Sequence, residues 1–113
     1  AAGDASRPIR IADHRGRHVV EASDIVAVEA DKECCRVLLG DGRSLLATET
    51  LGRLEERLPT PPFARVSRSL IVNMAALERI EPRAQGKGVL RFRLSDVRLA
   101  VGRAAMTGIR RLV

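Results

Sequence analysis

The arginines of this chain are the residues best suited to binding chemistry, and they are concentrated in its C-terminal half. Residues 65–113 hold eleven Lys or Arg against three Asp or Glu, whereas residues 1–64 hold nine against eleven. Ser67, Ser69 and Asn73 lie among these arginines. Guanidinium groups attract phosphates, and hydroxyl and amide groups fix the register, so the mixture is typical of a polyanion-binding surface. Charge alone leaves two alternatives open: a basic face that only contacts solvent, and one that docks an acidic protein partner.

The serines and glycines do not form a catalytic motif. Neither Ser67 nor Ser69 stands in a Gly-x-Ser-x-Gly elbow, and no histidine lies near them in the sequence. Gly86-Lys87-Gly88 lacks the spacing of a phosphate-binding P-loop and is better explained as a hairpin turn. We therefore expect that the protein is not an enzyme and uses no cofactor.

Histidine and cysteine spacings do not predict a metal site. His14 and His18 flank Gly16 and are interpreted as surface loop residues. Cys34 and Cys35 are adjacent, which matches neither a zinc motif nor a disulfide framework. Successive residues of a strand point to opposite faces, so we expect one inward and one outward thiol. Reduced thiols favour a cytoplasmic domain, whether the full-length protein is soluble or tethered to a membrane.

The aromatic content distinguishes between kinds of nucleic acid. The chain has no Trp and no Tyr, and its two phenylalanines, Phe63 and Phe92, fit the pattern of core residues. Proteins that bind RNA or single strands stack bases on exposed aromatic side chains. Because the chain lacks such aromatic side chains, duplex DNA is the favoured ligand of the basic surface.

Most segments alternate apolar and polar residues, which is typical of half-buried strands. Asp41-Gly42 is a strong hairpin signal between two of them. The stretch Phe63–Asn73 is apolar at both ends and basic in its centre. The other expected strands are Ile9–Ala12, His18–Glu21, Ile25–Glu29, Cys35–Leu39, Ser44–Ala47, Leu77–Ile80, Val89–Leu94 and Val97–Val101.

The sequence switches to a helical period at one place in its centre. A helix is predicted over Thr48–Leu58, because Leu51, Leu54 and Leu58 share one face. Thr48 is expected to cap its start, and the prolines that follow end it.

A weaker helix is predicted over Arg103–Leu112, where Gly108 lowers the helix propensity. The whole pattern predicts a single all-β-dominated domain of short antiparallel strands with one or two short helices. Residues 1–16 are interpreted as an N-terminal tail or linker remnant with a candidate edge strand, and residues 17–113 as the domain. No apolar run is long enough to span a membrane.

Four motifs resemble those of a known family in the same order along the chain. Asp24–Ala30 is similar to the opening strand of the LytTR family, and Leu51–Pro59 to its Leu-x-x-Leu-Glu-x-x-Leu-Pro helix. Phe63–Asn73, Phe-Ala-Arg-Val-Ser-Arg-Ser-Leu-Ile-Val-Asn, resembles the family's Phe-x-Arg-Ile-His-Arg-Ser-Tyr-Ile-Val-Asn. Val101-Gly102-Arg103 resembles its Val-Ser-Arg before the last helix. The resemblance covers about residues 17–113.

The resemblance implies an elongated β-sandwich whose loops enter successive major grooves of duplex DNA. By matching position, Arg68 and Arg103 would read base edges, most simply guanine. The loop over residues 31–36 would supply a further base contact from Cys35. The expected phosphate and positioning contacts are Lys32, Arg36, Arg65, Ser67 and Ser69.

The resemblance also implies a biological context. Members of this family are DNA-binding output domains of bacterial transcription regulators, among them the response regulators of two-component signal transduction. They commonly bind paired DNA repeats as two copies, and a receiver or sensor domain precedes them in the full-length protein. No membrane contact by the domain itself is expected.

Overall fold

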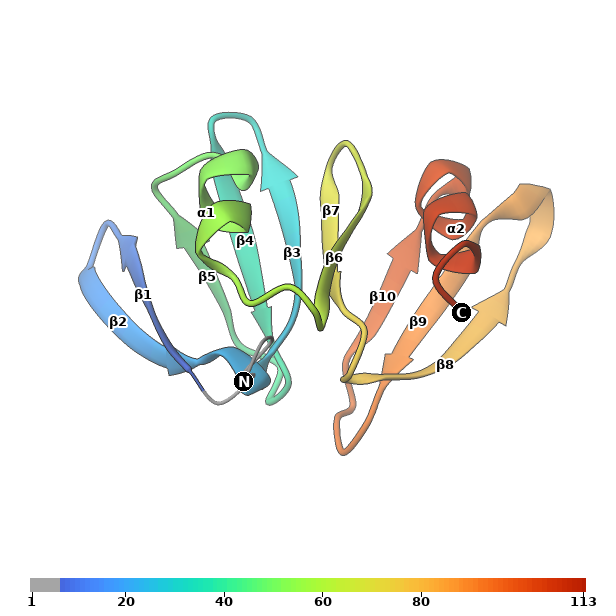
Figure 1. The fold of residues 1–113 in the computed structure, drawn as a ribbon, viewed down its shortest axis with the longest axis horizontal. Helices are drawn as coiled ribbons and strands as arrows, with labels where there is room; N and C mark the ends of the chain where they lie inside the picture. Colours follow the sequence, from blue (N-terminus) through green and yellow to red (C-terminus); the bar gives the residue numbers. More distant parts are fainter. Residues whose placement is uncertain (1–6) are drawn as a thin grey trace.

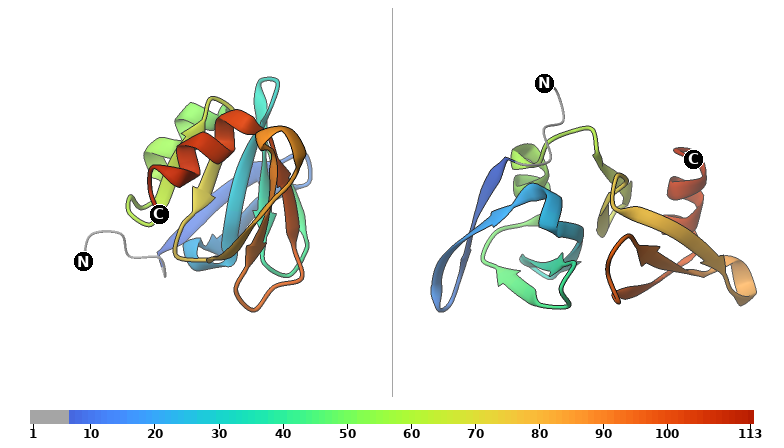
Figure 2. Two further views of the ribbon diagram at one scale, coloured as in Figure 1. Left: turned by 90° about the vertical axis from the view of Figure 1, so that its right-hand side faces the viewer. Right: turned by 90° about the horizontal axis from the view of Figure 1, so that it is seen from below.

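The computed structural model describes residues 7–113, which form ten strands, two α-helices and two 3-10 turns (Figures 1 and 2). Neither α-helix in that range is long and apolar enough to cross a membrane. The elements follow one another in the order β1 (Pro8–Asp13), β2 (Gly16–Glu21), η1 (Ala22–Asp24), β3 (Ile25–Asp31), β4 (Cys34–Leu39), β5 (Ser44–Ala47), α1 (Leu51–Arg57), β6 (Phe63–Ser67), β7 (Leu70–Asn73), β8 (Leu77–Pro82), η2 (Ala84–Gly86), β9 (Gly88–Phe92), β10 (Arg98–Val101) and α2 (Arg103–Arg110).

The strands form three antiparallel sheets. A five-stranded sheet of order β5-β4-β3-β7-β6 lies in the middle, with the β1–β2 hairpin on one side and the β10-β9-β8 sheet on the other (Figure 1). The predicted fold class, β-dominated with short antiparallel strands and one or two short helices, is confirmed, and the helices number two. The stretch Phe63–Asn73 is a hairpin of two strands, β6 and β7.

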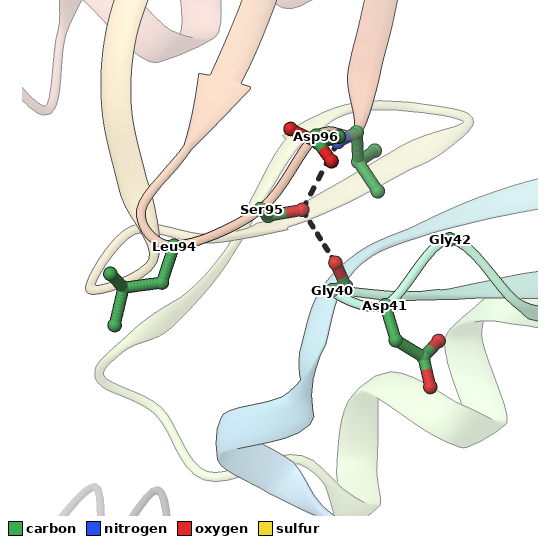
Figure 3. A pocket seen from close by; sticks show the side chains of 7 residues that line it. Gly40, Asp41, Gly42, Leu94, Ser95 and Asp96 are labelled. Carbon is green, nitrogen blue, oxygen red and sulfur yellow. Dashed lines mark hydrogen bonds between the residues drawn. The ribbon is translucent and has the colours of Figure 1, made fainter.

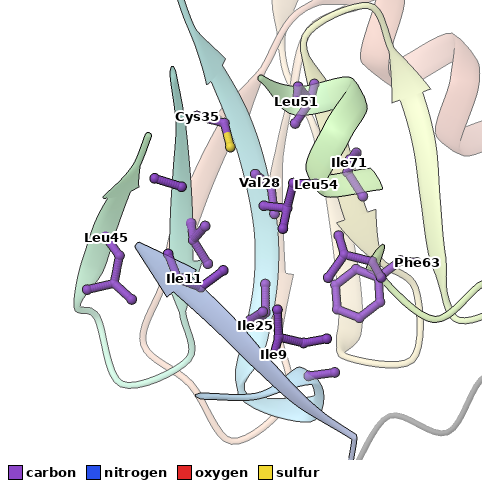
Figure 4. Close-up of a cluster of buried hydrophobic side chains, with 14 of the residues drawn as sticks. Ile9, Ile11, Ile25, Val28, Cys35, Leu45, Leu51, Leu54, Phe63 and Ile71 are labelled. Carbon is purple, nitrogen blue, oxygen red and sulfur yellow. The ribbon is translucent and has the colours of Figure 1, made fainter. Parts of the chain in front are cut away.

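Two hydrophobic cores lie against opposite faces of the central strands. Ile25 and Val28 of β3 and Ile71 of β7 join the first core, where they pack with β1, β4, β5 and α1 (Figure 4). Ala27 and Val72 face the second core, which β8–β10 and α2 complete. Because both faces of β3 and β7 are covered, these strands read as nearly continuous apolar runs. The molecule measures 40 × 32 × 24 Å.

Strand β1 falls within the segment interpreted as an N-terminal tail with an edge strand. It pairs along its whole length with β2, and Ile9 and Ile11 are buried in the first core. The backbone N–H of Thr48 donates to the carbonyl of Ala12, which joins β5 to β1. The expected tail at residues 1–6 lies outside the described residues.

Helix α1 begins later than predicted, and Thr50, not Thr48, caps it. The Thr50 hydroxyl accepts a hydrogen bond from the Arg53 N–H at 3.3 Å, which is the N-cap to N3 geometry. The Thr48 hydroxyl instead donates to the Ala12 carbonyl. Two hydrogen bonds from Thr48 to Ala12 of β1 therefore hold this residue at the end of β5 and not at the start of α1.

The last residues of one predicted strand and one predicted helix, Leu94 and Leu112, are exposed. Strand β9 ends at Phe92, and Leu94 adopts a φ of +54° in the turn that follows, where its side chain is fully exposed. Leu112 lies beyond the end of α2 and is 52% exposed. In both cases the regular element ends before the apolar pattern does.

Helix α2 packs unusually closely on β6, and Gly108 makes this possible. A Cβ at Gly108 would lie 2.0 Å from the Val66 carbonyl oxygen and 2.8 Å from its carbon. The glycine that weakens the helix signal is thus required by the packing of α2. Ala105, Met106 and Ile109 bury the same side of the helix in the second core.

We predict that Gly108→Ala lowers the free energy of unfolding by about 1–3 kcal/mol, because the added methyl group must push α2 away from β6. The matched control is Gly52→Ala in α1, where a Cβ meets nothing within 4 Å. That variant should gain up to about 1 kcal/mol from helix propensity. Urea unfolding of both variants checks this, and equal effects would contradict the packing argument.

Candidate nucleic-acid interface

Three connections meet at one end of the molecule, the upper end in Figure 1: β3–β4, β6–β7 and β10–α2. Glu29 of β3 pairs with Leu70 at the start of β7, and the Ala30 N–H donates to the Ser69 carbonyl at 2.8 Å. Ser67 and Ser69 line a groove together with Gly102 at the start of α2. The predicted site residues of the β6–β7 turn therefore lie beside the β10–α2 connection, which leads to Arg103.

The β6–β7 turn is held by the guanidinium of Arg65. Its Nε donates to the Ser67 carbonyl at 2.9 Å, and Nη2 donates to the Arg68 carbonyl at 2.5 Å. Its Nη1 forms an ion pair with Glu55 of α1 at 2.8 Å. A planar fork is suited to bridging three acceptors in this way. The side chain expected to contact phosphate thus shapes the turn that carries Arg68.

Arg68 and Arg103 contrast with Arg65, because both are exposed and their guanidinium groups have no hydrogen bond or ion pair within residues 7–113. Arg68 stands at the tip between β6 and β7, and Arg103 is the first residue of α2. The hydroxyl of Ser67 accepts a hydrogen bond from the Ser69 N–H at 3.3 Å. The two arginines are free to bind a ligand at this end of the molecule.

The β3–β4 loop, expected over residues 31–36, is shorter than predicted. Only Lys32 and Glu33 separate β3 from β4, and Lys32 adopts a φ of +59° at the exposed tip. Arg36 lies within β4, where its guanidinium pairs with Asp31 at 3.2 Å. The structure therefore presents Lys32 without a partner among the described residues, whereas Arg36 has one.

Cys35 does not lie in that loop but in β4, and its side chain is completely buried in the first core (Figure 4). In this position its thiol has no access to a base edge. Burial and the nearby carboxylate of Glu49 raise the pKa of the Cys35 thiol to about 11, so the group stays protonated. Cys34 is half-buried at the start of the strand. The inward and outward arrangement expected from strand geometry is confirmed.

Asn73, grouped with the basic residues in the sequence, has a structural role that sequence reasoning missed. It is 2% exposed, donates to the Ile25 carbonyl at 2.9 Å and accepts from the Ala75 N–H at 3.1 Å. It joins the end of β7 to the start of β3. Its position directly after the apolar run Leu70–Val72 was the sequence signal that could have indicated a buried role.

Several other arginines are paired on the outer face of the β8–β10 sheet. Glu81 accepts hydrogen bonds from Arg79 at 2.7 Å and Arg83 at 3.0 Å, and Arg91 lies 3.5 Å away. Desolvation opposes ionisation of Glu81, but the hydrogen bonds from Arg83 and Arg79 lower its pKa. This carboxylate therefore neutralises part of the basic face.

At the opposite end of the molecule, the β9–β10 turn contacts the β4–β5 turn of the central sheet. Ser95, in the β9–β10 turn, donates to the Gly40 carbonyl at 2.6 Å and accepts from the Val97 N–H at 3.1 Å (Figure 3). Asp41, in the β4–β5 turn, caps its own hairpin by accepting the Arg43 N–H, which lowers the pKa of its carboxyl. No group of three or more His, Cys, Asp and Glu side chains within residues 7–113 could hold a metal.

Comparison with known proteins identifies the family and the fold of the chain. The sequence profile of the LytTr DNA-binding domain matches residues 15–113. The chain belongs to the LytTr DNA-binding domain family. This LytTr domain has the fold of a solved LytTr DNA-binding domain from Bacillus cereus, with a TM-score of 0.73 and 23% sequence identity over 93% of this chain and 94% of that one. No curated protein matches the chain.

We predict that Arg65 acts through the shape of the turn and not through its charge. Arg65→Lys keeps the charge but cannot bridge three acceptors, so it should destabilise the domain by about 1 kcal/mol, nearly as much as Arg65→Ala. Amide hydrogen exchange at Arg68 and Ser69 should accelerate in both variants. If Arg65→Lys behaves as the unmodified protein while Arg65→Ala weakens DNA binding, Arg65 is a phosphate contact instead.

We predict that Cys35 affects stability and not base preference. Cys35→Ser should cost about 1–3 kcal/mol, because it buries a hydroxyl group without a partner. Cys34→Ser, at the half-buried neighbour, is the matched control and should cost less. Thermal unfolding and a duplex-selection assay measure the two effects. A changed base preference with unchanged stability would restore the base-reading role expected from the sequence.

Proposed function

We propose that this LytTr domain binds duplex DNA sequence-specifically, as the output domain of a bacterial transcription regulator. The observation that carries the proposal is a pair of exposed arginines, Arg68 and Arg103, on neighbouring connections at one end of the molecule, neither of which has a side-chain partner in the described part of the chain. The family to which the chain belongs supports DNA as the ligand.

In this proposal Arg68 and Arg103 enter successive major grooves, where a guanidinium donates two hydrogen bonds to the O6 and N7 atoms of guanine. Lys32, Ser67 and Ser69 contact phosphates at the same end, because a lysine and two hydroxyl groups suit backbone contacts that fix the register. Arg36 is a weaker phosphate candidate, since Asp31 already neutralises it. Arg65 contributes by holding the turn.

We further infer that two copies bind paired repeats and that a receiver or sensor domain precedes this domain in the full-length cytoplasmic regulator. The solved relative supports the second inference, since its name places it in a methyl-accepting/DNA response regulator. Each copy would supply the three connections described above. Two copies on adjoining repeats would double the base contacts.

We predict that Arg68→Ala and Arg103→Ala each weaken binding to the preferred duplex by about 1–3 kcal/mol and relax the preference at one base pair. Lys32→Ala should instead weaken binding to all duplexes similarly and reduce the salt slope by about 1. Arg43→Ala, which removes a charge at the opposite end, is the control. Affinities on matched and base-substituted duplexes check the assignment. Equal losses on every duplex would make both arginines phosphate contacts.

The experiment that tests the function is duplex selection with the purified domain at two salt concentrations. Enrichment of a repeated motif, with affinity falling log-linearly by about 0.9 per phosphate contact, supports the proposal. No enrichment and no salt-sensitive binding would overturn it and favour a protein-interaction module whose basic face docks an acidic partner. Competition with single-stranded DNA of the same sequence separates duplex from single-strand binding.

A further inference from the structure

The charged end of the Arg103 side chain has no partner within residues 7–113, but its aliphatic part lies against the backbone of another element. A Cβ at Gly86 would lie 3.2 Å from Cγ of Arg103, 3.6 Å from Nε and 3.7 Å from Cδ. The Arg103 side chain therefore passes directly over the bare Cα of Gly86. The contact joins the start of α2 to the β8–β9 connection. Both lie toward the end of the molecule that carries the β3–β4 and β6–β7 turns (Figure 1).

The β8–β9 connection has a backbone conformation that fixes the position of this Cα. Gln85 and Gly86 have φ values of +64° and +76°, so two successive residues are left-handed. The Arg83 N–H donates to the Lys87 carbonyl at 2.9 Å, and the Lys87 N–H donates to the Ala84 carbonyl at 3.3 Å. The connection is closed on itself by these two bonds and offers Arg103 a defined surface.

We propose that Gly86 is a positioning residue for DNA recognition, because its bare Cα holds the Arg103 side chain in the direction from which it reads a base. The inference rests on the proposed base-reading role of Arg103. In this inference the β8–β9 connection contributes to base preference through Arg103, without contacting the base itself. A Cβ at Gly86 would come within 3.2 Å of Cγ, which is tighter than an ordinary van der Waals contact, so the Arg103 side chain would have to shift by a few tenths of an ångström.

The expected size of the effect follows from side-chain ordering. A long side chain that is already held in place loses less conformational freedom when it binds. Removing that advantage should weaken binding to the preferred duplex roughly threefold to tenfold. The loss should fall on the base pair read by Arg103 and not on other sequences.

The test compares four variants of the domain: Gly86→Ala, Gly42→Ala, Arg103→Ala and the double variant of Gly86 and Arg103. Gly42 is the matched control, because it also has a positive φ, +95°, but a Cβ there meets nothing within 4 Å. Both alanine variants place a side chain at a positive φ, and thermal unfolding measures the backbone strain that results in each. Affinities are then determined on the selected duplex and on one substituted at the base pair that Arg103→Ala affects.

Support would come from loss of discrimination at that base pair in Gly86→Ala, none in Gly42→Ala, and a double variant no worse than Arg103→Ala. Additive effects, or a uniform loss on all duplexes, would overturn the inference while leaving the proposed function intact.

A measurement without DNA separates the two proposals. The ¹⁵N relaxation of Arg103 Nε should show an ordered side chain in the unmodified domain and a mobile one in Gly86→Ala, with exposed Arg111 as the mobile reference. If Arg103 Nε is as mobile as that of Arg111 in the unmodified domain, Gly86 does not position it. If it is ordered but Arg103→Ala leaves base preference unchanged, the positioning is supported and the base-reading role fails.

Discussion

The architecture depends on two central strands, β3 and β7, being covered on both faces. Ile25, Val28 and Ile71 bury into one core while Ala27 and Val72 bury into the other, so neither half of the molecule can form without this sheet. Antiparallel pairing of β3 with β7 brings the β3–β4 and β6–β7 turns to the same end. The placement of two candidate DNA-contacting turns is thus a consequence of how the hydrophobic cores are built.

The third connection is placed by a second constraint, the close approach of α2 to β6. With Gly108 against the Val66 carbonyl, the helix axis lies nearer to the strand than any larger residue would allow. The start of α2 then lies beside Ser67 and Ser69, where they line a common groove. A shift of the helix would change the separation between Arg103 and the β6–β7 turn, which a pair of base contacts must match to the groove spacing.

The sequence predicted the elements better than it predicted their ends. Period-two alternation and Asp41-Gly42 located the strands, because half-buried strands and tight hairpins are determined by local residue types. Local pattern could not show that Thr48 pairs with β1, leaving Thr50 to cap α1, or that Leu94 turns outward. Matching by position placed Cys35 in a loop, whereas the strand extends further and turns this side chain into the core. Thr48 and Cys35 were misplaced because of contacts between distant segments, and Leu94 because β9 ends before the apolar pattern does.

Some of the paired arginines have an acidic partner that is close in the sequence. Arg43, Arg79 and Arg83 each lie two residues from an acidic partner. Arg68 is flanked by Ser67 and Ser69, and Arg103 by Gly102 and Ala104, so no adjacent carboxylate competes for either guanidinium. Small neutral neighbours also leave room for a large polyanion to approach. An arginine neutralised by a nearby carboxylate gives up part of its attraction for phosphate or guanine, since that ion pair must break or share its hydrogen bonds first. Paired arginines such as Arg65 and Arg79 therefore support turns and sheets, whereas Arg68 and Arg103 present unpaired guanidinium groups, within residues 7–113, at the end that faces DNA in the proposed complex.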